Sequence, residues 1–119
     1  PAASRAEGLD GQAIYGGAKQ ALARWMRQNN PLFAGSGIRI NAIAPGYTQT
    51  GMTESGLKDP DFKESIEQFV NTIPLGRRGE PADQANVISF LLSEKASFIS
   101  GVVLFTDGGH DALFRPHRF

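Results

Sequence analysis

Three stretches of the chain repeat apolar residues at helical spacing. In the first, from about 14 to 28, apolar side chains recur at i, i+3, i+4, i+7 and i+8, which predicts a helix with one buried face. We expect this helix to end at Asn29-Asn30-Pro31, because proline cannot donate the next helical hydrogen bond. The second stretch begins at Asp59-Pro60, an N-cap followed by a proline suited to the first helical turn. The third begins at Pro81 and reaches about Leu92.

Two apolar runs have the composition of β-strands. Ile38–Ala44 has apolar side chains on both faces and stops at Pro45-Gly46, and Val102–Thr106 is closed by Asp107-Gly108-Gly109. A strand that follows a helix and ends in a glycine-containing loop is the order of an α/β protein with parallel strands. Ligands of such proteins bind beyond the carboxyl ends of the strands, so the loop after the first strand is a candidate site.

The segments between these elements carry weaker signals. Pro1–Gly11 is small and polar and predicts a loop, and residues 51–58 have no strong pattern. Apolar residues at helical spacing between 62 and 70 have two interpretations. They pack on the core, or they belong to a mobile cover, residues 51–73, that closes over an apolar substrate.

The composition narrows the class of protein. The 119 residues suffice for one small domain, and 12 Lys plus Arg balance 12 Asp plus Glu, so no nucleic-acid partner is indicated. The absence of cysteine excludes a disulfide framework and fits a reducing compartment such as the cytoplasm. Because no apolar run approaches the ~20 residues of a membrane span, we expect no membrane partner.

The candidate chemistry lies at the start of the first predicted helix. Tyr15 and Lys19 are four positions apart, so their side chains share one helix face, with Cβ atoms roughly 5–6 Å from each other. A positive charge about 4 Å from a phenol, at an effective dielectric of about 20, stabilises the phenolate by about 4 kcal/mol. Such stabilisation would let Tyr15 act as a general acid/base near neutral pH. An isolated Tyr-x-x-x-Lys pair also arises by chance, as a half-buried tyrosine beside a solvated lysine.

Three further polar groups have no decisive pattern. The loop Pro45–Thr50 combines hydroxyls with exposed backbone amides, which suits an amide or phosphate ligand but also an ordinary hydroxyl-rich turn. Arg77-Arg78 could meet a phosphate, although a solvated pair in a loop is the commoner arrangement. His110 and His117 are seven residues apart without a cysteine, which is a poor metal constellation, and we expect no metal.

Taken in order, the motifs resemble the carboxyl-terminal half of the short-chain dehydrogenase/reductase family. The resemblance runs from about Gly11 to Gly109, and several motifs in one order are far more specific than a single Tyr-x-x-x-Lys pair. The motifs are Tyr15-x-x-x-Lys19, Ile38–Gly46, Thr48 with Thr50, Pro74-Leu75-Gly76-Arg77, Phe90-Leu91-Leu92-Ser93, Ala96-Ser97-Phe98 with Gly101, and Asp107-Gly108-Gly109. The resemblance implies an α/β fold, the C-terminal part of a Rossmann-type doubly wound parallel sheet. Residues 1–119 would supply two strands and three main helices of one such domain, with its N-terminal half missing from this sequence.

The resemblance also implies an activity and roles for particular residues. The expected enzyme is an NAD(P)-dependent oxidoreductase that interconverts a secondary alcohol and a ketone, with NAD slightly favoured over NADP. Tyr15 would exchange a proton with the substrate oxygen, and Lys19 would stabilise the Tyr15 phenolate and hold the nicotinamide ribose. The loop residues would hold the nicotinamide carboxamide and the pyrophosphate end. The residues expected at the cofactor are Tyr15, Lys19, Pro45, Gly46, Thr48 and Thr50.

Within the family, the chain is similar to the bacterial hydroxysteroid dehydrogenase/carbonyl reductase subgroup. This narrower resemblance rests on residues 56–60 and 64–70, on Gly76–Pro81 and on the tail Arg115–Phe119. It implies a steroid or another bulky apolar ketone as substrate, which agrees with an apolar cover. Family members use helix surfaces to oligomerise, so a homo-oligomer is also expected.

Two parts of the family's machinery have no counterpart in the sequence. There is no glycine-rich turn for the pyrophosphate, and Ser4 stands slightly too close to Tyr15 to be the substrate-positioning serine, so it is left out of the site. We therefore expect this segment alone to be inactive and to need the N-terminal half of the same polypeptide as its partner. The alternatives are a non-catalytic nucleotide- or protein-binding member of the same fold, or a fragment that serves only in assembly.

Overall fold

The computed structural model describes residues 11–118, and residues 1–10 and 119 lie outside this description. The predicted loop Pro1–Gly11 therefore falls outside it as well, apart from Gly11, which begins a helix. The described chain divides into two compact units. The first consists of residues up to 42 together with 100–102, and the second of residues 43–99 together with those from 103 onward.

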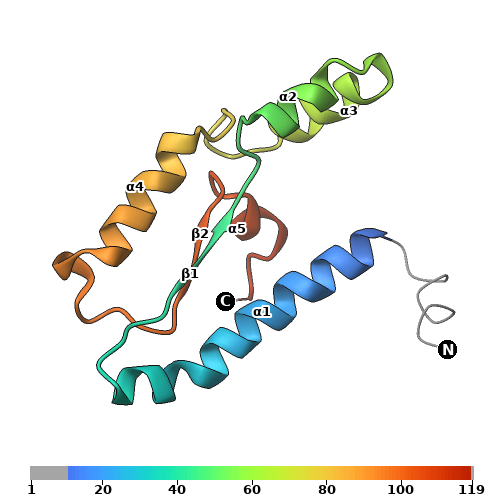
Figure 1. The fold of residues 1–119 in the computed structure, drawn as a ribbon. Coiled ribbons are helices and arrows are strands. Elements are labelled where there is room, and N and C mark those ends of the chain that lie inside the picture. Colours follow the sequence, from blue (N-terminus) through green and yellow to red (C-terminus); the bar gives the residue numbers. More distant parts are fainter. Residues whose placement is uncertain (1–10, 119) are drawn as a thin grey trace, which may run out of the picture. The chain divides into compact units, whose positions relative to one another are not determined.

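The first unit is dominated by helix α1, Gly11–Gly35, which contains Pro31 (Figure 1). The predicted end at Asn29-Asn30-Pro31 is wrong, because the helix continues for one turn past the proline. The Asn29 side-chain amide donates to the Trp25 carbonyl at 2.8 Å. Phe33, in the added turn, packs edge-on against Trp25 with ring centroids 6.2 Å apart. These contacts help to offset the hydrogen bond that Pro31 cannot donate.

A left-handed glycine ends α1. Gly37 has a φ of +74°, and its N–H donates to the Ala34 carbonyl at 2.9 Å. The N–H of Ile38 donates to the Phe33 carbonyl, also at 2.9 Å. This pair of bonds is a Schellman motif, which satisfies carbonyls that a helix end leaves free.

Two short strands form a parallel sheet (Figure 1). Strand β1 is Ala42–Pro45 and strand β2 is Val103–Thr106. The N–H of position 42 donates to the carbonyl of position 102 at 2.9 Å, and that of position 46 to the carbonyl of position 106 at 3.1 Å. Because the bonded positions advance in the same direction along both strands, the pairing is parallel, as predicted.

Strand β1 begins four residues later than the predicted strand, Ile38–Ala44. The preceding residues bond to a turn instead of to a strand. The N–H of Gly101, whose φ is +80°, donates to the Ile40 carbonyl at 2.8 Å. The Asn41 side-chain oxygen accepts from the Val102 N–H at 3.1 Å, where a ladder would use a backbone carbonyl. The strand boundary therefore depends on a turn about sixty residues further along the chain, which the local pattern does not reveal.

The second unit contains two predicted helices and two unpredicted ones. The starts at Asp59-Pro60 and Pro81 are confirmed, and the Asp59 carboxylate accepts from the Asp61 N–H at 3.0 Å as an N-cap. The three main helices expected from the sequence are present, as α1 and the two predicted helices of this unit, whereas the two additional helices are short and carry no repeating apolar pattern. The elements are α2 (Gly51–Leu57), α3 (Pro60–Asn71), α4 (Pro81–Leu92), the 3₁₀ turn η2 (Glu94–Ala96) and α5 (His110–Phe114).

The second unit has a small buried core contributed by α3, α4, η2 and the residues that follow α3. Val70, Ile73, Leu91 and Ala96 are its buried apolar residues. The turn after β1 approaches the turn after β2 so closely that a Cβ on Gly46 would lie 2.5 Å from the Asp107 Cα. Among residues 11–118, no helix has both the length and the apolar content needed to cross a bilayer.

The close approach of these two turns gives a stability prediction. In Gly46→Ala the added methyl group would force the turns apart, and we expect the free energy of unfolding to fall by about 1–3 kcal/mol, measured by urea denaturation. Gly51→Ala is the control, because a Cβ there would meet nothing within 4 Å, and its effect should stay within about 0.5 kcal/mol. Equal effects of the two substitutions would contradict this account.

Candidate functional site

Tyr15 and Lys19 lie on successive turns of α1. Lys19 Nζ is 5.4 Å from the centroid of the Tyr15 ring, which is within the range of a cation–π contact. Tyr15 is 67% exposed, so its ring and hydroxyl are accessible to a ligand. The predicted proximity of the two side chains is confirmed, and their roles in proton transfer remain predictions.

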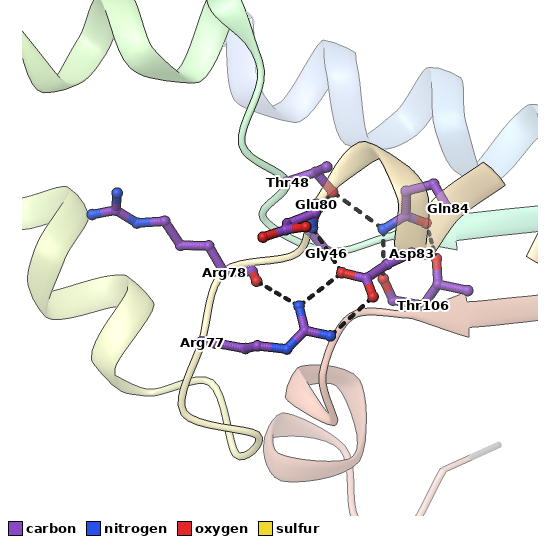
Figure 2. Close-up of polar contacts among 8 residues, drawn as sticks. All are labelled: Gly46, Thr48, Arg77, Arg78, Glu80, Asp83, Gln84 and Thr106. Carbon is purple, nitrogen blue, oxygen red and sulfur yellow. Dashed lines mark hydrogen bonds and ion pairs between the residues drawn. The ribbon is translucent and has the colours of Figure 1, made fainter. Parts of the chain in front are cut away.

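Thr48 lies in the loop after β1 and is held from two sides (Figure 2). Its hydroxyl donates to the Gly46 carbonyl at 3.0 Å and accepts from Gln84 Nε2 at 3.2 Å. Thr48 also forms an isolated parallel bridge with Gly79, which fixes the backbone of the loop. Because a hydroxyl has one proton and two lone pairs, Thr48 retains one acceptor position for a ligand.

Thr50 is the N-cap of α2. Its backbone N–H donates to Thr53 Oγ1 at 2.7 Å, and its own hydroxyl accepts from the Thr53 N–H at 3.4 Å, which together form a capping box. Thr53 Oγ1 also lies 3.0 Å from the Thr48 carbonyl. The Thr50 hydroxyl therefore helps to cap α2. Its contact with a cofactor remains a prediction.

Gln84, on α4, joins the two turns and was not found from the sequence (Figure 2). Its Nε2 donates to Thr48 Oγ1 at 3.2 Å and to the Thr106 carbonyl at 3.1 Å. Its Oε1 accepts from the Thr106 hydroxyl. Both amide protons and the amide oxygen are thus engaged, and α4 is fastened to the end of β2 and to the loop after β1. Nothing in the spacing of the sequence distinguishes this glutamine from an ordinary polar helix residue.

Arg77 is an exposed loop residue, as the sequence favoured, but it also forms an ion pair that the sequence did not reveal. Its guanidinium forms two bonds with the Asp83 carboxylate, at 2.7 and 2.9 Å, and a third with the Arg78 carbonyl at 2.9 Å (Figure 2). The hydrogen bond from Arg77 holds the pKa of Asp83 well below its ordinary value, and the Glu80 N–H, bonded at 2.7 Å, acts in the same direction. The bond to Asp83 likewise raises the pKa of Arg77. The pair fixes the connection before α4 to the first turn of that helix.

A cavity of about 470 Å³ lies in the second unit, between α4 and the turn after β2. Its wall is largely apolar, and the backbone of Gly108 and Gly109 completes it. Tyr47 also lines it, and the Tyr47 hydroxyl is buried without a hydrogen-bond partner among the described residues. The volume lies in the range of about 300–1,000 Å³ that small-molecule sites occupy. The apolar residues of the wall are Ile73, Leu75, Val87 and Phe105.

The segment 51–73 is neither wholly packed nor wholly free. Val70 is buried, and a Cβ on Gly56 would lie 3.2 Å from Ile66 Cδ1, so α2 and α3 are in close contact. Met52 and Phe62, in contrast, are 84% and 61% exposed. Val70 therefore packs in the core, as one of the two interpretations expects, and the role of the segment as a cover remains a prediction.

His110 is the buried one of the two histidines, and His117 is exposed. Among residues 11–118, no three or more His, Cys, Asp or Glu side chains are grouped to hold a metal ion. His110 Nε2 instead lies 2.7 Å from the Thr72 hydroxyl. The sequence pattern around this histidine bears only on metal binding and does not reveal the contact with Thr72, the C-cap of α3.

Sequence comparison relates nearly the whole chain to known reductases and dehydrogenases. A family model described as enoyl-(acyl carrier protein) reductase matches residues 2–111. The chain is 44% identical over 109 residues to 3-alpha-hydroxysteroid dehydrogenase/carbonyl reductase of Comamonas testosteroni. This match covers 92% of the chain and 42% of that protein, so the chain spans less than half the length of this relative.

Solved structures also match most of this chain and less than half of their own length. The 3-alpha-hydroxysteroid dehydrogenase from Pseudomonas sp. B-0831, solved in complex with NADH, is 45% identical with a TM-score of 0.79 and covers 90% of this chain. A dehydrogenase structure from Agrobacterium tumefaciens with bound NADP is 36% identical, with a TM-score of 0.71 over 82% of this chain. The matched part is 41% of the first chain and 38% of the second.

The Arg77–Asp83 pair gives a pH-dependent prediction. A carboxylate whose pKa is lowered by folding adds stability above its unfolded pKa of about 3.9, and this is lost as pH falls toward the folded value. We expect the difference in unfolding free energy between wild type and Asp83→Asn to be full at pH 7 and to narrow below about pH 4. Arg77→Gln should show the same pH dependence with a smaller amplitude, because the Glu80 N–H still bonds the Asp83 carboxylate, whereas Arg78→Gln leaves the pair in place and is the control. A difference that stays constant from pH 7 to pH 2 would contradict the prediction.

Proposed function

The chain belongs to the short-chain dehydrogenase/reductase family, and from this membership we propose that it is the C-terminal half of an NAD(P)-dependent oxidoreductase. This enzyme interconverts a secondary alcohol and a ketone. The observation that carries the proposal is the placement of Tyr15 and Lys19 on one face of α1, with Nζ 5.4 Å from the ring centroid.

In the proposed reaction, the proton moves through Tyr15. During reduction the Tyr15 hydroxyl donates its proton to the carbonyl oxygen of the substrate, and during oxidation the phenolate accepts it back. The ammonium of Lys19 stabilises the phenolate by its charge and donates hydrogen bonds to the ribose of the cofactor. The nicotinamide cofactor, when bound, supplies or accepts the hydride.

The residues of this chain fit part of such a cofactor. Tyr15 is exposed on α1, Thr48 retains an acceptor position, and Thr50 is an exposed residue at the start of α2. The backbone of Pro45 and Gly46 belongs to the same proposed site. A glycine-rich turn for the pyrophosphate is absent from the sequence, so the proposal assigns that part of the site to a preceding half of the polypeptide.

Both nicotinamide dinucleotides are compatible with the proposal. One similar structure holds NADH and another holds NADP. NAD is slightly favoured, because the NADH complex is the more similar of the two, at 45% identity against 36%. The residue that reads the ribose 2′ position follows the second strand of such domains, and no counterpart of that strand stands in this sequence.

We propose a steroid or another bulky apolar ketone as the substrate. The relative from Comamonas testosteroni is a 3-alpha-hydroxysteroid dehydrogenase/carbonyl reductase, and the segment 51–73 presents exposed apolar side chains at Met52 and Phe62. Closing such a segment over an apolar substrate would bury these side chains. A cytoplasmic location and a homo-oligomer belong to the same proposal.

The catalytic role is tested by removing the Tyr15 hydroxyl and the Lys19 ammonium group separately. In the enzyme formed with its N-terminal half, Tyr15→Phe should lower kcat for a ketosteroid by at least about 100-fold, because general acid catalysis contributes factors of that size. Lys19→Met should lower kcat and also weaken cofactor binding, followed by the fluorescence of the bound cofactor. Lys95→Met, on η2, is the control. Retention of full activity by Tyr15→Phe would contradict the assignment.

A second experiment tests the need for the other half. We expect the isolated 119-residue chain to bind neither NADH nor NADPH tightly, because it holds only the nicotinamide end of the proposed site. Fluorescence titration with both cofactors measures this directly. Tight binding by the isolated chain would show that the segment is sufficient as a nucleotide-binding unit, contrary to the proposal.

A further inference from the structure

The C-terminal end of α3 is tied to His110 by one hydrogen bond whose direction can be assigned. The Thr72 hydroxyl lies 2.6 Å from the Phe69 carbonyl, which can only accept, so the single hydroxyl proton is used there. The contact of 2.7 Å between Thr72 Oγ1 and His110 Nε2 therefore requires Nε2 to carry the hydrogen. His110 donates, and the end of α3 accepts.

The ring of His110 is also held from its sides. It lies 4.7 Å from the Phe69 ring and 4.9 Å from the Phe114 ring, centroid to centroid. Phe69 in turn makes an edge contact with Tyr47, whose ring is 6.3 Å away. His110 is only 6% exposed. These rings connect α5, the end of α3 and the loop after β1.

His110 stands on a turn that is itself fixed. The carboxylate of Asp107 accepts from the N–H groups of Gly109 and Asp111, at 2.9 and 2.6 Å. Gly108 and Gly109 have φ values of +68° and +93°, which glycine adopts without strain. The imidazole is therefore presented to α3 from a rigid support at the end of β2.

The same turn packs against the residues that follow α3. A Cβ on Gly108 would lie 2.6 Å from Ile73 Cγ2, so only a glycine fits there. The N–H of Leu75 donates to the Gly108 carbonyl at 3.1 Å. The chain that leaves α3 is thus fastened by a backbone bond, by close packing and by His110, all within four residues of the helix end.

The other end of the segment 51–73 is fastened as well. Thr53 Oγ1 lies 3.0 Å from the Thr48 carbonyl, and the Gln49 N–H donates to the Gly79 carbonyl at 2.8 Å. Between the two fastened ends, Phe62 remains exposed. A segment held at both ends can move only as far as its anchors permit.

We propose that His110 is a positioning residue that fixes the C-terminal anchor of the segment 51–73 through Thr72, and that it thereby sets how tightly the enzyme holds its ketone substrate. This inference rests on the proposed function and on the cover role of that segment. His110 has no part in the proton transfer, which belongs to Tyr15. Its loss should change substrate affinity and leave the chemical step and the cofactor site largely intact.

Two pairs of variants separate the hydrogen bond from the packing. Thr72→Val removes the acceptor at nearly constant volume, and Thr72→Ser keeps it. His110→Phe keeps a ring between Phe69 and Phe114 but removes the donor, and His117→Phe makes the same change in the exposed tail. The Thr72 pair keeps the inference testable if His110→Phe does not fold.

In the complete enzyme, Thr72→Val and His110→Phe should each raise KM for a ketosteroid by about three- to tenfold, the factor expected for one lost hydrogen bond. The value of kcat and the KM for the cofactor should change by less than about twofold. Thr72→Ser and His117→Phe should match wild type. Hydrogen exchange of backbone amides in peptides covering 69–75 should become faster in the first two variants alone.

The outcomes distinguish this inference from the proposed function. An active wild type whose KM is unchanged in Thr72→Val and His110→Phe would overturn the positioning role alone. Unchanged hydrogen exchange at 69–75 in Thr72→Val and His110→Phe would show that His110 does not anchor the end of α3, whatever the activity of these variants. A wild type without activity on any ketone would contradict the proposed function, and the substrate role of His110 with it.

Discussion

The second unit depends on the parallel pairing of β1 with β2. Because parallel strands end at the same edge of a sheet, the turn after each strand arrives at the same place, and Gly46 lies directly against Asp107. Gln84 can bond the loop after β1 and the end of β2 at once only because the two strand ends are this close. The Asp107–Gly109 turn then carries the end of α3. The close contact between the two turns thus connects α3, α4 and the loop proposed to hold the cofactor.

Features encoded by neighbouring residues could be predicted from the sequence. The starts of α3 and α4 follow from a capping residue and a proline at the first position, which act within a single turn. The proximity of Tyr15 and Lys19 follows from the helical period alone. The same local reasoning failed at Pro31, where the packing of Phe33 on Trp25 extends the helix beyond the expected stop.

Features that depend on distant partners could not be predicted. The start of β1 is set by a turn about sixty residues away, and Arg77 meets its carboxylate only after α4 has formed. Gln84 and His110 look like ordinary residues in the sequence, because their partners come from other elements. The resemblance to a family compensated in part, since it identified the motif around Asp107, but it did not reveal that this turn supports α3.

Because both N–H groups and the oxygen of the Gln84 amide are engaged in hydrogen bonds, few other residues can take its place. The Gln84 amide directs two donors and one acceptor to three atoms on two different elements. Glutamate cannot replace it, because a carboxylate offers only acceptors, and methionine offers neither these donors nor this acceptor. A one-residue slip of α4 would also carry the amide about 100° around the helix and away from both turns. In a mutational library, position 84 should therefore tolerate few substitutions, whereas positions on the outward face of α4 should tolerate many.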